Sequence, residues 1–181
     1  MHHSGFTLIE ALISLTIIAI LAAISLPAAR DFISHTQEEL LQKQLIHVIQ
    51  LAKHEAIAMH APVGLCQSDN QSTCSGSWEQ GQLIFLDETA DGIVHSRQQI
   101  ISVMQMSVQH GRIKWRSFPR YRQYLLFSPM QWMENENGTF WHCHADKSVW
   151  AMTVSKTGRT QIIYPNKKGE IKDGRGQALN C

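Results

Sequence analysis

One uninterrupted apolar segment near the N-terminus constrains this chain more than any other feature of its sequence. Residues 6–29 read FTLIEALISLTIIAILAAISLPAA and contain a single ionisable side chain, Glu10. A helix needs about 20 apolar residues to cross a bilayer, so this segment is long enough to span a membrane. The alternative is a cleaved secretory signal, which has a basic start and an apolar region of about 7 to 15 residues. The segment is longer than that and MHHSG holds no Lys or Arg, so a retained helix is favoured.

Glu10 is the one ionisable residue of this segment, and we expect its carboxylate to need a partner that neutralises it. A carboxylate at mid-membrane costs roughly 2.5 to 3.5 kcal/mol on insertion scales. The α-amino group of a neighbouring subunit would neutralise it, if the chain were cut after Gly5 so that Phe6 became the N-terminus. In the alternative interpretation Glu10 lies near enough to the helix end to reach the lipid headgroups.

A short leader ends in Gly5, Phe6 follows it, and Glu10 comes a few residues later at the start of the apolar run. This pattern resembles the processing site of type IV prepilins and type II secretion pseudopilins. The resemblance implies that a prepilin peptidase cleaves between Gly5 and Phe6 and methylates Phe6, and that Glu10 guides packing into a filament. It also implies a break or kink at Pro27, which removes a helix hydrogen bond. Leaders of this family usually carry a basic residue, and this leader has none.

Helical periodicity continues beyond Arg30 but becomes amphipathic, which predicts that this part of the helix packs on a core. Pro62 is expected to end the helix. The apolar stripe is formed by Leu41, Leu45, Val48, Ala52, Ala56 and Met59.

The residues after Pro62 favour strands. Eight β-prone runs are separated by turn residues, which predicts antiparallel sheets. The runs are 63–67, 82–86, 99–103, 112–116, 124–127, 139–144, 149–154 and 159–164, with turns at Ser75-Gly76-Ser77, Asp91-Gly92, Asn137-Gly138 and Thr157-Gly158. The predicted fold class is therefore α+β, with a long N-terminal helix packed on an antiparallel β-sandwich-like head. The expected organisation is a leader (1–5), a transmembrane helix (6–29), an amphipathic helix (30–61) and a β-rich head (62–181).

Four cysteines lie beyond the apolar segment, and an even number suits two disulfides in an oxidising compartment. Four reduced thiols are the alternative. The sequence permits three pairings. We favour Cys66 with Cys74, which closes a short polar loop, and Cys143 with Cys181, which ties the C-terminal end to the head.

Four further motifs follow in order along the chain: LAKHEAI at 51–57, PVGLC at 62–66, SGSW at 75–78 and VSKTGR at 154–159. Together they resemble the GspH/FimT group of minor pilins and minor pseudopilins. The resemblance implies a single-pass inner-membrane protein with a periplasmic head that assembles with other pilins. The assembly that contains this subunit would be the tip complex of a type IV pilus or, alternatively, a type II secretion pseudopilus. Some members of the group bind DNA during natural transformation.

Positive charge is concentrated late in the chain. Residues 1–111 hold four Lys/Arg and ten Asp/Glu, a balance of −6, and residues 112–181 hold twelve and five, a balance of +7. In a strand, Arg112, Lys114 and Arg116 share one face, which could contact phosphates. The alternative is a solvated strand face whose opposite side, Ile113 and Trp115, lies in the core.

A second basic region begins near Gly158. DNA-binding members of the GspH/FimT group carry Gly-Arg-any-Arg there, and this chain has Gly158-Arg159-Thr160-Gln161. Arg159 matches the pattern and Gln161 does not. The basic residues that could contribute to a DNA site in this region are Arg159, Lys167, Lys168, Lys172 and Arg175.

No catalytic set is recognisable in the sequence, so we predict neither an enzyme nor a cofactor. His142-Cys143-His144 has no second pair of ligands at metal-binding spacing, and we expect no metal site. Cys143 is more simply explained by a disulfide.

Overall fold

The computed structural model describes residues 7–105, 111–118, 122–130, 137–174 and 176–181. The predicted cleavage site, Gly5 and Phe6, lies outside these residues, as does Arg175. The chain divides into two compact units, one ending at Leu40 and the other comprising Leu41–Cys181. The helix α1 (Leu8–Met59) contributes to both units, and the second unit is called the head below.

The first unit contains the apolar part of α1, in which no residue of Leu8–Leu26 is buried. The stretch Leu8–Leu26 is long and apolar enough to cross a membrane. The helix is assigned without interruption from Leu8 to Met59, so it is not broken at Pro27.

In the head, α1 contributes a buried apolar stripe. Leu41, Leu45, Val48, Ala52 and Ala56 are all buried, as the periodicity predicts. Ile49 is also fully buried, because it lies four residues after Leu45 on the same face. The prediction for Met59 is wrong: its side chain is 46% exposed in the last turn, just before the chain leaves the helix.

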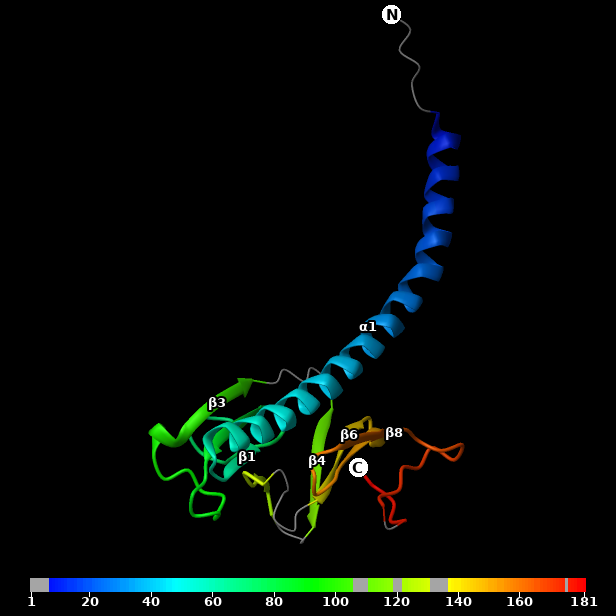
Figure 1. The fold of residues 1–181 in the computed structure, drawn as a ribbon. Helices are drawn as coiled ribbons and strands as arrows, with labels where there is room; N and C mark the ends of the chain where they lie inside the picture. The colour runs from blue at the N-terminus through cyan, green and yellow to red at the C-terminus, as the bar shows by residue number, and fades with distance from the viewer. Residues whose placement is uncertain (1–6, 106–110, 119–121, 131–136, 175) are drawn as a thin grey trace, which may run out of the picture. The chain divides into compact units, whose positions relative to one another are not determined.

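The described part of the head contains two four-stranded antiparallel sheets (Figure 1). The first has the order β3-β2-β1-β5, and the second has the order β4-β6-β7-β8. The strands are β1 (Val63–Gln67), β2 (Gly81–Leu86), β3 (Ile100–Gln105), β4 (Arg112–Phe118), β5 (Tyr124–Phe127), β6 (Asn137–His144), β7 (Lys147–Val154) and β8 (Thr160–Ile163). Each of the eight predicted runs is a strand, with ends within two residues of the prediction. The predicted fold class is therefore confirmed.

One apolar core joins the helix and both sheets. Buried side chains of α1 cluster with Val63 and Leu125 of the first sheet and with Phe140 and Trp150 of the second. Because strands alternate their side chains between two faces, the opposite face of the second sheet points away from this core. That outer face carries the groove described below.

Two turns depart from the sequence prediction. Asn137 and Gly138 do not form a turn but begin β6, where a side chain on Gly138 would collide with the Trp115 ring. The turn between β6 and β7 is instead made by Ala145 and Asp146, with φ angles of 47° and 60°. Such positive φ values characterise the tight turns of β-hairpins, but alanine rarely adopts them.

Candidate functional sites in the N-terminal helix and on the head

Thr7 and Glu10 form a capping box at the start of α1. The Thr7 N–H donates to Glu10 Oε2 at 3.3 Å, and the Thr7 hydroxyl donates to the same oxygen at 3.2 Å. In return the Glu10 N–H donates to the Thr7 hydroxyl at 3.3 Å. Two main-chain donors that a helix start leaves open are thus satisfied. The carboxylate is thereby held in the first turn by its own chain.

The helix surface around Glu10 exposes large apolar side chains on every side. In Leu8–Leu26, none of the residues is buried within the chain itself. An isolated soluble helix would not be stable with such a surface, so lipid or other helices must cover it. Exposed side chains that show this are Leu8, Ile9, Leu12, Ile13, Leu15, Ile17, Ile18, Ile20, Leu21 and Ile24.

On the head, the predicted basic face of β4 is largely engaged by the C-terminal segment 171–181. Lys114 Nζ donates to the main-chain oxygens of Asn180, at 3.4 Å, and Cys181. Arg116 Nη1 lies 3.1 Å from Asp173 Oδ2, and its guanidinium stacks 5.3 Å from the centre of the Trp141 ring. Arg112 is exposed. Of the predicted set, Lys114 and Arg116 therefore tie down the chain's own end.

Apolar and covalent contacts fix the same segment to the outer face of the second sheet. Ile171 and Leu179 are buried against Trp141 and Ala151. The Trp141 indole N–H donates to the Asn180 carbonyl at 3.2 Å. Cys181 forms a disulfide with Cys143 in β6. The segment is thus a packed part of the head.

The second disulfide joins Cys66 in β1 to Cys74, so the chain has the pairing that we favoured. No free cysteine remains. Asn70 organises the enclosed loop, because its Oδ1 accepts the main-chain N–H groups of Ser72 and Thr73 at 3.0 and 2.9 Å.

Arg159 lies at the end of the turn that joins β7 to β8. The Arg159 N–H donates to the Ser155 hydroxyl at 3.1 Å, and Gly158 in this turn has a φ of 72°. Lys53 of α1 donates from Nζ to the Thr157 carbonyl at 2.9 Å and so anchors the turn on the helix. The Arg159 side chain is exposed.

Three further basic candidates, Lys167, Lys168 and Lys172, lie in or beside a second tight turn. Lys167 and Lys168 are exposed at its tip, where the Gly169 N–H donates to the Asn166 carbonyl at 2.8 Å. Lys172 lies 3.9 Å from the Glu170 carboxylate. The structure thus leaves Arg112 in β4, Arg159 in the β7–β8 turn, and Lys167 and Lys168 in the second turn exposed; Lys172 is exposed beside Glu170.

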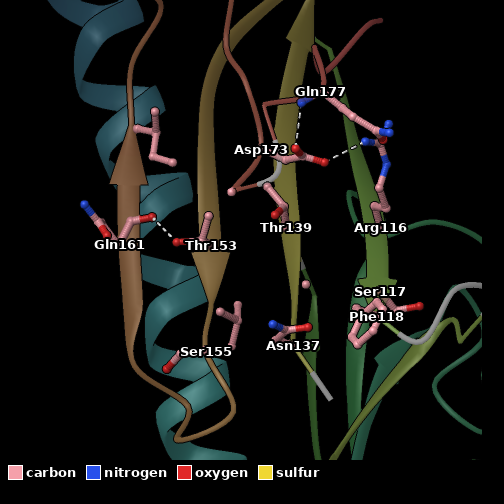
Figure 2. A pocket seen from close by; sticks show the side chains of 14 residues that line it. Arg116, Ser117, Phe118, Asn137, Thr139, Thr153, Ser155, Gln161, Asp173 and Gln177 are labelled. Atoms are coloured by element: carbon pink, nitrogen blue, oxygen red, sulfur yellow. Dashed lines mark hydrogen bonds and ion pairs between the residues drawn. The ribbon is translucent and has the colours of Figure 1, made fainter. Parts of the chain in front are cut away.

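A groove of about 420 Å³ lies on the outer face of the second sheet, beside the C-terminal segment (Figure 2). Arg116, Thr139, Thr153 and Gln161 are register partners across the four strands and line it as one row. Asp173 of the C-terminal segment forms part of its wall. Sequence reading missed this groove, because it needs residues from five separated segments.

The described residues hold no group of three or more His, Cys, Asp or Glu side chains placed to bind a metal ion. Cys143 is in a disulfide, as stated above. His142 is buried and stacks on the Trp150 ring, with ring centres 5.7 Å apart. His142 is therefore part of the packing of the second sheet.

The comparisons with known proteins give two family matches and one structural likeness. Residues 42–158 match the family described as type II transport protein GspH, and residues 1–26 match the prokaryotic N-terminal methylation motif. No curated protein sequence matches the chain significantly.

The fold resembles that of the type IV minor pilin FimU from Pseudomonas aeruginosa strain PAO1. Its P21 crystal structure aligns with a TM-score of 0.53 and 15% identity, over 73% of this chain and 92% of that chain. The P65 crystal form gives a TM-score of 0.49 and 15% identity, over 69% and 91%. At this identity the likeness concerns the fold.

The two family matches agree with each other and with the resemblance found in the sequence. The GspH match covers more than half of the chain, and the methylation motif covers the segment that contains Gly5, Phe6 and Glu10. The predicted resemblance to GspH/FimT-like minor pilins is confirmed. This chain belongs to the GspH family of pilin-like proteins.

Proposed function

We propose that the chain is a minor pilin of the tip or initiation complex of a type IV pilus, anchored by α1 in the inner membrane with its head in the periplasm. Its partners are the other pilins of that complex, and its role is structural and not enzymatic. The observation that carries the proposal is a membrane-length apolar helix that exposes its side chains and begins with one carboxylate.

The proposed maturation begins with a prepilin peptidase, which cleaves between Gly5 and Phe6 and methylates Phe6. The organisation that follows is a leader (1–5), a helix for membrane and filament (6–29), a helix that joins the head (30–61) and the head itself (62–181). The methylation motif found over residues 1–26 supports this order.

Glu10 then provides the specific step of assembly. In the single chain its carboxylate is held by Thr7. The new α-amino group of an adjacent subunit offers a full positive charge, which forms a stronger interaction than a neutral donor in a water-poor helix bundle. Assembly therefore exchanges a local hydrogen bond for an ion pair between subunits.

The test is the amount of subunit recovered in sheared filaments. Glu10→Gln and Glu10→Ala are expected to lower incorporation at least tenfold without lowering the level in the membrane. Glu39→Gln is the matched control, because Glu39 is an exposed carboxylate of the same helix outside the apolar segment. Normal incorporation of Glu10→Ala, or an uncut Gly5-Phe6 bond in mass spectra of the native N-terminus, would contradict the proposal.

A pseudopilin of a type II secretion system is the second candidate, and the description of the matching family, type II transport protein GspH, favours it. Deletion of the gene separates the two. Loss of twitching or transformation with normal enzyme secretion supports the pilus, and the reverse supports the secretion machine.

We further propose that basic residues of the head contribute to DNA binding. What supports it is the excess of positive charge in residues 112–181 and the exposure of Arg112, Arg159, Lys167 and Lys168. Lys114 and Arg116 are assigned a different role, since they contact the C-terminal segment. Lys172, exposed beside the Glu170 carboxylate, is a further candidate, and Arg175 is a candidate by sequence alone.

The salt dependence of binding tests the DNA site. Full-length protein in zwitterionic nanodiscs should bind duplex DNA at low salt, and neutralising Arg159, Lys167 and Lys168 together should flatten the log–log salt slope by about three. Arg97→Gln, in the acidic part of the chain, is the control. Unchanged binding by the triple variant removes the DNA role and leaves the assembly role intact.

A further inference from the structure

The groove on the second sheet has a lining that is polar but nearly neutral. Its floor is the row formed by Thr139, Thr153 and Gln161, and Arg116 at one end is paired with Asp173. Because these two charges lie 3.1 Å apart, they largely cancel at the distance of a ligand. A highly charged polymer such as DNA gains little from such a lining.

The main chain in the middle of the groove floor is also closed to a ligand. The central strands β6 and β7 are each paired on both sides, β6 with β4 and β7, and β7 with β6 and β8. The middle of the floor therefore offers no strand edge for an added β-strand, which is how extended peptides are commonly bound. Among the described residues, the outer strands of this sheet are β4 and β8. Recognition over the middle of the groove has to rely on side chains.

Hydroxyl and carboxamide groups dominate those side chains. Besides the floor row they are Asn137, Ser155 and Gln177. Ser117 also borders the groove, but it is buried and its hydroxyl accepts the Arg122 N–H at 3.1 Å. Hydroxyls and carboxamides both donate and accept hydrogen bonds, as sugar hydroxyls do. Asn137 Oδ1 adds a buried acceptor that has no hydrogen-bond partner among the described residues. Buried polar atoms are rarely left in this state.

An aromatic ring completes the site at the end of β4. Phe118 lines the groove with 44% of its surface exposed, and Figure 2 shows it beyond Ser117 on the same strand. An exposed ring offers an apolar face for the C–H side of a sugar ring, while the polar row meets its hydroxyls. The volume of about 420 Å³ lies within the usual range for small-ligand sites.

We propose that this groove binds a short, uncharged saccharide segment. Three properties together indicate this ligand class. The charges of Arg116 and Asp173 largely cancel, and the central strands β6 and β7 have no open edge. The lining also combines hydroxyl and carboxamide groups with one aromatic ring. The site is independent of the proposed assembly step, because none of its residues belongs to α1.

The experiment uses full-length protein in phosphatidylcholine nanodiscs, so that no sugar-based detergent competes. Saturation-transfer NMR with chitotriose, maltotriose and trigalacturonate should show contact with at least one neutral trisaccharide and none with the anionic one. Titration of the binding sugar gives its Kd. Absence of contact with both neutral trisaccharides, or stronger contact with trigalacturonate, would overturn the proposal.

Variants then locate the site. Gln161→Ala and Phe118→Ala should each raise the Kd at least tenfold. Gln123→Ala and Tyr164→Ala are the matched controls, since both residues are exposed and neither lines the groove. Near-UV circular dichroism checks that every variant is folded. Full affinity in the two groove variants, or equal losses in the controls, would contradict the assignment, as would a partner pilin cross-linking into the groove in place of sugar binding.

Discussion

In the first turn of α1, one hydroxyl serves both the helix and the carboxylate. Thr7 accepts the Glu10 N–H and donates to Glu10 Oε2, so it determines where the carboxylate lies in the unassembled subunit. A cap of this kind contributes about 1 kcal/mol to helix stability. In the proposed assembly step, the contribution of Thr7 is separable from that of the Glu10 charge.

We predict that Thr7→Val lowers incorporation into filaments, but less than Glu10→Gln. The Thr7 N–H remains to bind the carboxylate, and the charge that attracts the neighbouring amine is unchanged. Thr16→Val is the control, because the Thr16 hydroxyl donates to the Ile13 carbonyl in the same apolar stretch, away from Glu10. Quantitative blots of sheared filaments give the measurement; a Thr7 variant as defective as Glu10→Gln argues against a purely positioning role.

At the β6–β7 turn, we predict that Ala145→Gly stabilises the head. The left-handed conformation of Ala145, with φ of 47°, costs a residue with a side chain about 1 kcal/mol or more, and glycine avoids this cost. Ala58→Gly is expected to have the opposite sign, a loss of about 1 kcal/mol, because Ala58 is exposed within α1. Urea denaturation of both variants is the measurement, and a destabilised Ala145→Gly protein would contradict the prediction.

Among the elements, the strands were predictable because each is marked locally. A β-prone run between turn residues needs no knowledge of its partners, and all eight runs are strands. The two turns that differ from the sequence prediction also have local causes. Asn137-Gly138 has the composition of a turn, yet Gly138 is required where the Trp115 ring crosses β6. Ala145 and Asp146 form a turn without the glycine that usually signals one.

The C-terminal segment was not predictable as a cover for the basic face of β4. Lys114 contacts residues 66 and 67 positions away, and Arg116 contacts Asp173, 57 positions away. Alternation of charge along β4 indicated the face but not its occupant. In the sequence, only the expected Cys143–Cys181 disulfide indicated that the C-terminal segment lies back against the second sheet.

The two disulfides should differ in their contribution to stability. The Cys143–Cys181 bond joins residues 38 apart, and the Cys66–Cys74 bond joins residues 8 apart. From loop closure alone, they stabilise the head by about 4 and about 2.5 kcal/mol respectively. We predict this order for the double alanine variants in urea denaturation, since the longer loop restricts the unfolded chain more. An equal or reversed order would mean that local packing around Cys66 outweighs loop length.

At the scale of the whole molecule, the head contains its own core. Every residue of the largest core cluster lies at or after Leu41, where the second compact unit also begins. We predict that a chain starting at Leu41, made in an oxidising compartment, melts cooperatively at the same temperature as the head of the full chain in nanodiscs.

A chain starting at Lys53 is the matched comparison. It loses Leu41, Leu45 and Ile49, which are nearly or fully buried, and each such side chain contributes about 1.5 to 3 kcal/mol. Because the stability of an entire domain is only about 5 to 15 kcal/mol, the shorter chain should not fold. A cooperative transition in its thermal circular dichroism would contradict the assignment of these residues to the core.

The disulfides also determine when the subunit is complete. Both bonds lie within residues 66–181, and none of the four cysteines is free. Thiols remain reduced in a bacterial cytosol, so with the head in the periplasm, as we propose, the C-terminal segment acquires its covalent attachment only after translocation. The proposed order of biogenesis is then insertion, oxidation and polymerisation, and a newly inserted copy with open thiols is an immature subunit whose C-terminal segment is not yet covalently attached.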